Sequence, residues 1–436
     1  MREIFRRRRE ALLDRMTQER GEDAVAVVPA AQPQLRNNDT EYPFRQDSDF
    51  YYLTGFDEPD AVLVMATRER KTTLFVRPRD PERETWDGPR AGVEGAKSDY
   101  GADEAFPLGE LDANLIKLFQ NQHRLYYRLG RNRTLDARVF AAIERGTLRG
   151  RSPYHFPTEI VDLASLLHEQ RLVKSEHDLS SMRKAVAITG EAHVKAMGAA
   201  RPGMNEWEIE AVLLETFRRR GAKRVAYQSI VGSGHNAAVL HYVANDRTMA
   251  EGDLLLIDAG CEYDYFASDV TRTFPVSGTF SREQRAIYDV VLEAQLDSIS
   301  ACRVGATVDE VHRRSVAGIT RGLVKLGLLS GEPEKLIEEE KHKPFYMHRT
   351  SHWLGMDVHD VGAYYVGGKP RPLAPGMVLT VEPGIYLSKD FANVGPEWRS
   401  IGVRIEDDIL VTENGPVVLS EAIPKMPEDV ERACRG

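Results

Sequence analysis

Five residues in the second half of the chain carry side chains that bind divalent metals, and each stands beside an apolar segment or turn. They are Asp258, Asp269, His352, Glu382 and Glu406. Together they offer four carboxylates and one imidazole, with no thiolate among them. This hard donor set suits Mn²⁺, Fe²⁺, Co²⁺ or Zn²⁺ better than it suits a structural zinc site built from thiolates.

The number of carboxylates indicates two ions. Four exceed what one catalytic divalent ion normally takes from a protein, whereas two ions roughly 3.5–4 Å apart use them through bridging carboxylates. Such a pair lowers the pKa of a bridging water, so that hydroxide exists near pH 7 and can attack a carbonyl. Taken singly, each residue has an ordinary explanation as a cap, a turn residue, a core histidine or a solvated acid. However, five such residues follow one another along the chain, and each lies next to a predicted buried strand. This combination favours a metal centre.

The segment from Leu254 to Phe274 supplies two of these carboxylates. It opens with an apolar run that ends at Asp258, passes through a turn-like segment, and continues as a second extended segment that carries Asp269. We predict a β-hairpin whose strands lie in the interior. Because a buried carboxylate without a counter-charge is costly, two in one hairpin require cations, protons or arginines nearby.

The elements that position these residues indicate an α/β (α+β) protein of two domains, residues 1–173 and residues 174–436. The first half alternates predicted strands and helices, which is typical of a mixed, largely covered sheet. Its predicted strands are Ala24–Val28, Phe50–Thr54, Ala61–Met65, Thr72–Val76 and Leu125–Arg128, and its predicted helices are an opening amphipathic one, Leu111–Gln120 and Ala137–Arg145. The second domain opens on a capping box, Ser175 with Asp178, before a long helix.

Further elements of the second half follow from the same signals. Helices are predicted over Glu206–Arg219, from Ser281 to about Ser300, and after Thr307, and strands over Met377–Val381 and Ile401–Ile405. The strands end at Glu382 and Glu406 respectively. The pattern therefore predicts that separate strands deliver these two carboxylates to the site.

The composition excludes several classes of function. The 436 residues carry a formal charge of −9, so we expect neither nucleic acid nor anionic lipid as a partner. The basic run from Arg6 to Arg9 is interpreted as a solvated helix face, with a nucleic-acid patch as the less favoured alternative. The three cysteines form neither a disulfide framework nor a CxxC zinc site, and no signal peptide or membrane span is visible. We therefore expect a cytoplasmic protein.

Several motifs, taken in chain order, carry a resemblance to a known family. They are Leu256-Ile257-Asp258-Ala259-Gly260-Cys261, Ser268-Asp269-Val270-Thr271-Arg272-Thr273-Phe274, Ser351-His352-Trp353-Leu354-Gly355, Thr380-Val381-Glu382-Pro383-Gly384 and Gly402-Val403-Arg404-Ile405-Glu406-Asp407-Asp408. This order resembles the pita-bread metallopeptidases, which include methionine aminopeptidase, prolidase and aminopeptidase P. The closer match is to the bacterial aminopeptidase P (Xaa-Pro aminopeptidase) group, whose N-terminal domain the segments Glu41–Phe50 and Tyr52–Pro59 resemble.

The resemblance implies a mixed α/β domain followed by a pita-bread (creatinase/aminopeptidase-like) catalytic domain. It also implies that the five ligands hold two divalent ions, manganese first, with Zn²⁺ or Co²⁺ as alternatives. Asp269 and Glu406 would bridge the ions, and Glu382 would also carry a proton. Around them, His241 and His359 would stabilise the oxyanion, His348 would contact the peptide near proline, and Tyr386 and Arg404 would surround the site.

The sequence departs from the family pattern between two of these histidines. The family usually has a glycine and a small or apolar residue there, whereas this chain has Arg349 and Thr350. An arginine at a position that needs φ > 0 or close approach would be strained. Alternatively, Arg349 places a cation beside the substrate channel, which would affect the preferred peptide length.

The resemblance implies cleavage after the first residue of peptides that begin Xaa-Pro. Proline's tertiary amide has no N–H and a fixed φ, so general aminopeptidases fail on it. Two alternatives remain at this stage: a prolidase limited to Xaa-Pro dipeptides, and a non-catalytic pita-bread binding module, which would normally lack the ligands. The resemblance also implies a homodimer or homotetramer.

Overall fold

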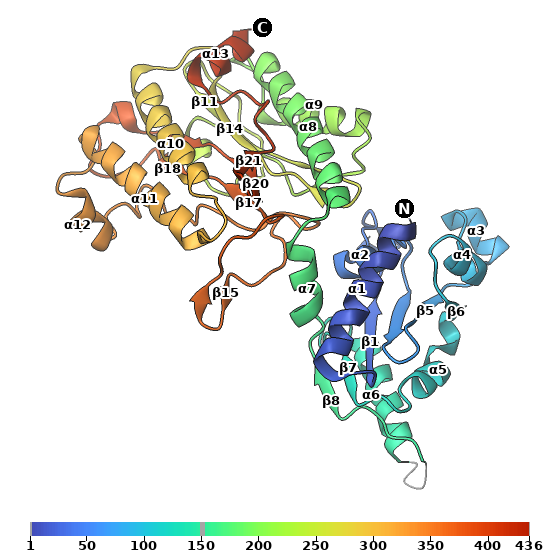
Figure 1. Ribbon diagram of the computed structural model, residues 1–436. Helices are drawn as coiled ribbons and strands as arrows, with labels where there is room; N and C mark the ends of the chain where they lie inside the picture. The colour runs from blue at the N-terminus through green and yellow to red at the C-terminus, as the bar shows by residue number, and fades with distance from the viewer. Residues whose placement is uncertain (1, 149–152, 436) are drawn as a thin grey trace. The chain divides into compact units, whose positions relative to one another are not determined.

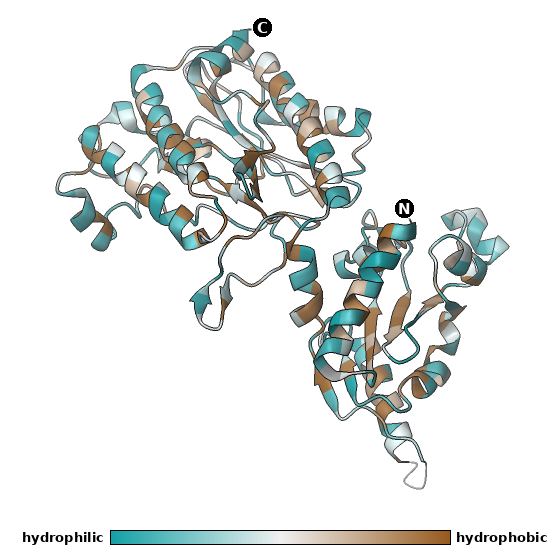
Figure 2. Cartoon of the chain, in the orientation of Figure 1, coloured by the Kyte–Doolittle hydropathy of each residue, from teal (hydrophilic) through white to brown (hydrophobic). Residues whose placement is uncertain are grey.

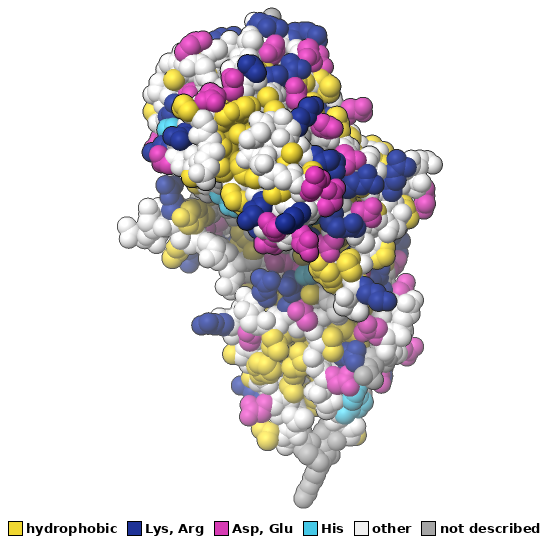
Figure 3. Space-filling view, turned by 90° about the vertical axis from the view of Figure 1, so that its left-hand side faces the viewer, with side chains coloured by type: hydrophobic (Ala, Val, Ile, Leu, Met, Phe, Trp, Pro, Cys, Tyr) yellow, Lys and Arg dark blue, Asp and Glu magenta, His cyan; other side chains and the backbone are white. Residues whose placement is uncertain are grey.

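The computed structural model describes residues 2–148 and 153–435, and the chain divides into two compact units, Met1–Gln170 and Arg171–Gly436 (Figure 1). In each unit the strands are the most hydrophobic elements and the outer helix faces are hydrophilic (Figure 2). On the face shown in Figure 3, Lys and Arg side chains are interspersed with Asp and Glu side chains. None of the described helices is long and apolar enough to cross a lipid bilayer.

The first unit is a six-stranded mixed sheet in the order β6-β5-β4-β1-β7-β8. Its strands are β1 (Ala24–Pro29), β4 (Val62–Ala66), β5 (Lys71–Val76), β6 (Glu104–Pro107), β7 (Arg124–Tyr126) and β8 (Glu159–Val161), with a separate hairpin of β2 (Leu35–Asn37) and β3 (Thr40–Glu41). The central strand β1 runs antiparallel to β4 and parallel to β7. Both β1 and β4 are buried almost throughout, as expected for strands covered on both faces.

The helices of the first unit are α1 (Arg2–Arg20), α2 (Ser48–Thr54), α3 (Pro81–Asp87), α4 (Gly92–Ser98), α5 (Leu111–Leu118), α6 (Arg133–Thr147) and α7 (Ala164–Leu172), the last of which ends two residues into the second unit. The prediction of a strand over Phe50–Thr54 is wrong, because α2 occupies it. The Asp47 side chain accepts a hydrogen bond from the amide of Phe50, and Gly55 ends the helix with φ of 67°. These caps outweigh the strand preference of an aromatic run.

The interpretation of Arg6–Arg9 as a solvated face is wrong for half of the run. Arg6 and Arg7 are exposed and pair with Glu3, but Arg8 and Arg9 are 7% and 4% exposed. Arg8 donates to the carbonyl of Tyr52, and Arg9 donates to the carbonyls of Leu53 and Gly101. Consecutive helical residues point in different directions, so the inner pair satisfies carbonyls at the C-terminal end of α2 that the helix itself leaves free.

The second unit assembles several small antiparallel sheets. They are β10-β11-β14, β13-β12-β9, β17-β20-β21, β18-β19 and β15-β16. The strands are β9 (Arg224–Val225), β10 (Ile230–Ser233), β11 (Leu254–Asp258), β12 (Cys261–Tyr263), β13 (Phe266–Ala267), β14 (Thr271–Pro275), β15 (Tyr365–Val366), β16 (Lys369–Pro370), β17 (Val378–Val381), β18 (Gly384–Leu387), β19 (Ile401–Arg404), β20 (Asp407–Thr412) and β21 (Gly415–Val418).

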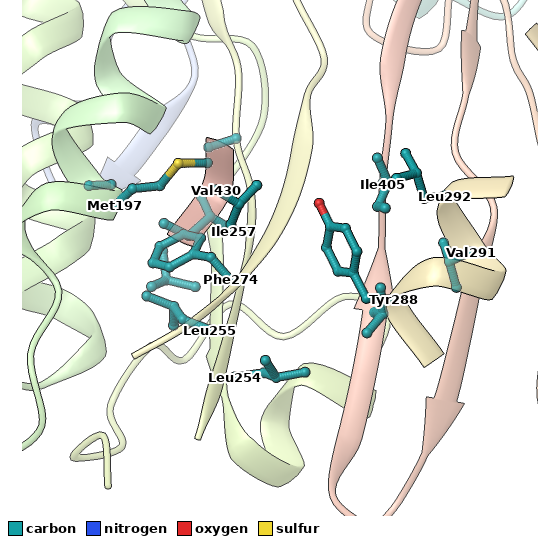
Figure 4. Close-up of a cluster of buried hydrophobic side chains, with 14 of the residues drawn as sticks. Met197, Leu254, Leu255, Ile257, Phe274, Tyr288, Val291, Leu292, Ile405 and Val430 are labelled. Carbon is teal, nitrogen blue, oxygen red and sulfur yellow. The ribbon is translucent and has the colours of Figure 1, made fainter. Parts of the chain in front are cut away.

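Helices pack on these sheets and enclose the largest hydrophobic cluster. They are α8 (Glu176–Ala199), α9 (Glu206–Arg219), α10 (Arg282–Ser300), α11 (Val308–Lys325), α12 (Pro333–Glu338) and α13 (Pro427–Arg435). The predicted capping box at Ser175 is present, and a second capping box at Ser281 opens the helix predicted to begin there. In Figure 4, Met197 of α8 lies near Ile257 and Phe274 of the strands.

The predicted hairpin is confirmed, since β11 and β14 pair antiparallel with Asp258 opposite Thr271. Between them, β12 and β13 form a second, unpredicted pair that joins β9 in another sheet. Asp269 lies two residues before β14 rather than inside a strand. The pairing of β11 with β14 therefore ends at Asp258 and Thr271, and both Asp258 and Asp269 lie at this end of the hairpin.

Candidate metal centre and active site

The second unit contains a cavity of about 540 Å³ where the sequence-predicted site residues meet. Nine of them line it: His241, Asp258, Asp269, His348, His352, His359, Glu382, Arg404 and Glu406. The tenth, Tyr386, lies behind the wall, and its hydroxyl is 2.8 Å from Nε2 of His348 and 3.1 Å from Nη1 of Arg404. Segments separated by as many as 165 positions therefore contribute to one cavity.

A glycine fixes the spacing of Asp258 and Asp269. A Cβ atom at Gly260 would lie 1.8 Å from the carbonyl oxygen of Ser268, so only glycine permits this approach of the two segments. The amide of Ala259 donates to the carbonyl of Val270 across the same opening. The backbone thereby holds the two carboxylates on the same side of the cavity.

The glutamates come from segments at the ends of strands in two other sheets. Glu382 follows β17 directly, and its amide donates to the carbonyl of Thr350. Glu406 lies between β19 and β20 and is 2% exposed. Its Oε2 accepts a hydrogen bond of 2.6 Å from the hydroxyl of Thr271, which orients the carboxylate toward Asp269.

The His352 ring is oriented so that Nε2 faces the carboxylates. Its Nδ1 lies 3.1 Å from the carbonyl of Trp353, so this nitrogen carries the hydrogen and donates it. Nε2 lies 3.4 Å from Asp269 Oδ2 and 3.5 Å from Glu382 Oε1. A second hydrogen bond of this kind is what fixes the tautomer of a metal-ligating histidine.

The donor atoms are close enough to share a metal ion. One ligand atom each from Asp269, His352 and Glu406 lies within 4.8 Å of the others. Asp258 and Glu382 border the same space. The arrangement accordingly fits divalent cations by both the chemistry and the convergence of its donors.

The electrostatics of the cluster also favour cations. Burial, followed for Glu406 by the charges of Asp269, Glu382 and Asp258, raises the pKa of Asp269 and Glu406. Burial raises the pKa of Glu382 to about 8, although His352 and Arg404 lower it. Burial alone would lower the pKa of His352, but Asp269 and Glu382 raise it to about 9. This excess of buried negative charge is what a pair of divalent ions would neutralise.

The remaining predicted residues surround the cluster. Arg404 donates to the hydroxyls of Thr271 and Tyr386 and forms an ion pair of 2.5 Å with Asp258. The carboxylate that Arg404 contacts is thus that of Asp258, whereas Glu406 is oriented by Thr271. His359 packs its ring edge-on against His352, with centroids 4.3 Å apart.

Four apolar side chains also line the cavity, and we call them together the apolar wall. They are Ile230, Leu240, Val243 and Val358. A cavity that combines a few converging polar groups with an apolar wall is typical of a small-ligand site.

Sequence reasoning missed Tyr227. Its hydroxyl lies 2.6 Å from Asp258 Oδ1 and equally within reach of Asp269 Oδ1, and burial raises its pKa well above the ordinary value. The neutral phenol therefore offers its one hydrogen to the two aspartate oxygens, which share it. The one signal in the sequence is its place just before the β10 strand.

The chain matches known proteins over nearly its whole length. Residues 180–413 match metallopeptidase family M24, and residues 5–126 match the aminopeptidase P N-terminal domain. The chain is 43% identical over 433 residues to the Xaa-Pro aminopeptidase of Escherichia coli (strain K12), covering 99% of this chain and 97% of the relative.

Solved structures agree with this similarity. Pseudomonas aeruginosa aminopeptidase PepP superposes with a TM-score of 0.97 at 49% identity, covering 100% of this chain and 98% of that one. Zinc-substituted E. coli aminopeptidase P in complex with product superposes with a TM-score of 0.96 at 43% identity, covering 100% and 98%.

Proposed function

The chain belongs to metallopeptidase family M24, and we propose that it is a Xaa-Pro aminopeptidase, which releases the first residue from peptides with proline in second position. The observation that carries the proposal is the convergence of all five ligand side chains in one cavity beside an apolar wall. A complete ligand set argues against a binding module without catalysis. The N-terminal domain of the aminopeptidase P type distinguishes the chain from general aminopeptidases.

The proposed ligand set is Asp258, Asp269, His352, Glu382 and Glu406, with Asp269 and Glu406 as the shared carboxylates. When bound, two divalent ions would lower the pKa of a water and polarise the substrate carbonyl. Manganese is the first expectation, with Zn²⁺ or Co²⁺ as alternatives, since oxygen-rich donors accept several ions.

The protein's own groups would carry the remaining steps. The Glu382 carboxylate, with its raised pKa, would accept a proton from the attacking water and return it to the proline nitrogen as the bond breaks. His241 and His359 would donate to the oxyanion of the tetrahedral intermediate. The network of Tyr386 and Arg404 would hold His348 and Asp258 in place.

The apolar wall suits the substrate's proline. Proline offers a hydrophobic ring and no N–H, so recognition must come from packing rather than from a backbone hydrogen bond. We propose that the ring is received next to His348, while the α-amine lies on the side of Asp258 and Asp269.

The deciding experiment compares Xaa-Pro-Yaa tripeptides such as Arg-Pro-Pro with Xaa-Pro dipeptides, with Mn²⁺ supplied. Release of the first residue from tripeptides supports the proposal, and a peptide with alanine in second position is the matched control. Cleavage of dipeptides alone would instead indicate a prolidase. A protein that binds no divalent metal and releases nothing from either peptide would refute a hydrolase.

We also propose that the two functional domains divide between residues 173 and 174, that the protein forms a homodimer or homotetramer, and that it is cytoplasmic. Gel filtration of the purified protein tests the oligomeric state.

A further inference from the structure

A second and larger cavity adjoins the metal-site cavity in the same unit. Its volume is about 890 Å³. Its lining includes Asp309, Arg349, His352, His359, Tyr365 and Glu382. Four of these residues, Arg349, His352, His359 and Glu382, also line the first cavity, so the two spaces meet at the reacting groups.

Arg349 stands where the two cavities meet and is the residue at which the sequence departs from the family pattern. Its side chain is 58% exposed, and it follows His348 directly. Arg349 does not have a positive φ, so the backbone strain that the sequence raised as one possibility is absent. The arginine therefore sits in an ordinary backbone conformation and presents a cation to both cavities.

The guanidinium is held in place from one side. Its Nη2 pairs with Oδ1 of Asp309, in the first turn of α11. The other oxygen of Asp309 accepts a hydrogen bond of 2.7 Å from the hydroxyl of Tyr365 in β15. Among the described residues, Asp309 is the carboxylate paired with Arg349, and it uses only Nη2. The other N–H groups of the guanidinium can therefore bind a ligand.

We propose that Arg349 is a specificity-determining residue that binds the C-terminal carboxylate of short peptide substrates. This inference rests on the proposed function. The scissile bond of the substrate must lie near His352, His359 and Glu382, which line both cavities. In the substrate only one residue precedes this bond. The peptide beyond proline then extends past Arg349 into the second cavity. A guanidinium fork matches a carboxylate in shape and charge, and one already oriented by Asp309 loses little freedom on binding.

The test compares kcat/KM for one Xaa-Pro-Yaa tripeptide as the free acid and as the C-terminal amide, with Mn²⁺ supplied. The parent enzyme should prefer the acid, and Arg349→Gln should abolish that preference, lowering kcat/KM for the acid by about tenfold or more while leaving the amide nearly unchanged, as expected for loss of a charge-assisted hydrogen bond. The loss should appear mainly in KM, because the carboxylate is bound equally in the ground and transition states.

Two further variants keep the result interpretable. Arg349→Lys retains the charge without the fork and should keep part of the preference. Arg314→Gln is the matched control, because Arg314 is a partly exposed arginine of α11 that pairs with Asp297 and lines neither cavity. It should behave as the parent does.

The possible failures differ in what they refute. A parent enzyme that cleaves both peptides without discrimination, or an Arg349→Gln variant that keeps the full preference, overturns the role of Arg349 and leaves the proposed function standing. A parent enzyme that cleaves neither peptide refutes the proposed function, and this inference with it.

Discussion

Two adjacent residues of the second unit, Glu406 and Asp407, show opposite solutions to the burial of a carboxylate. Both are 2% exposed or less. Asp407 accepts hydrogen bonds from Arg272, Ser420, Gln295 and Lys425 at 2.8, 2.6, 2.7 and 2.5 Å respectively. Burial would raise the pKa of Asp407, but Arg272 and Lys425 hold it well below the ordinary value.

Glu406 faces the other way, toward carboxylates. Its partner is the Thr271 hydroxyl, and burial with the charges of Asp269 and Glu382 raises its pKa well above the ordinary value. The protein thus supplies the cations for Asp407 from its own sequence and leaves the Glu406 cluster in need of external ones. This difference marks a metal centre more sharply than the presence of acidic residues does.

The largest effect is expected from neutralising the cluster where it performs chemistry. Glu382→Gln removes a metal ligand and the group that moves the proton, so kcat should fall by about 10²–10⁴-fold. The fold should be retained, since an amide relieves rather than creates unpaired buried charge. Kinetics with Mn²⁺, together with circular dichroism, measure both. Full activity of the variant would remove Glu382 from the mechanism.

Two isosteric changes at neighbouring positions, Asp407→Asn and Glu406→Gln, should affect stability in different ways. Asp407→Asn leaves the buried Arg272 and the partly buried Lys425 beside an amide, and should lower the free energy of unfolding by about 3–5 kcal/mol. Glu406→Gln, measured without metal, should change it by less than about 1 kcal/mol or increase it. Urea unfolding of both variants in EDTA gives the two values. If the two variants were equally destabilised, the proposed difference between a compensated Asp407 and an uncompensated Glu406 would be wrong.

Much of this arrangement is predictable from the sequence, because strand ends and acidic residues coincide in it. The hairpin, the helices with capping boxes and the fold class follow from local patterns. The burial of Asp407 does not, since its partner Arg272 lies 135 positions away. The roles of Tyr227 and Arg8 likewise depend on contacts between distant segments. Periodicity carries no information about such contacts.

Bound metal ions should neutralise the negative charge of the carboxylates around Glu406, as Arg272 and Lys425 neutralise that of Asp407. Mn²⁺ at about 100 times its Kd should stabilise the protein by about 2.7 kcal/mol, if the unfolded chain does not bind it. Thermal unfolding with Mn²⁺ and with EDTA measures the shift. Glu406→Gln should lose most of it, whereas the control Arg314→Gln should retain it. A parent protein with identical unfolding in Mn²⁺ and EDTA would contradict a cation-dependent cluster.

The smallest expected effect concerns a third solution, in which a buried group stays neutral. His193 is fully buried on α8, and its Nε2 donates to the carbonyl of Ala259 over 3.1 Å. Its Nδ1 has no hydrogen-bond partner among the described residues. Burial lowers the pKa of His193 to about 4, although the Ala259 carbonyl opposes this shift.

The sign of the pH dependence follows from these contacts. In the unfolded chain His193 is protonated below about pH 6.5, whereas in the folded protein it stays neutral down to about pH 4. The free energy of unfolding therefore falls as the pH decreases through this window. Between pH 7.5 and pH 5 the loss should be about 2 kcal/mol. His193→Gln can keep the donor to Ala259 without titrating, and should remove this part of the dependence, whereas His177→Gln on the same helix should not. Urea unfolding at both pH values separates the two variants. Parallel pH dependences in His193→Gln and the parent would show that burial without a counter-charge does not keep His193 neutral.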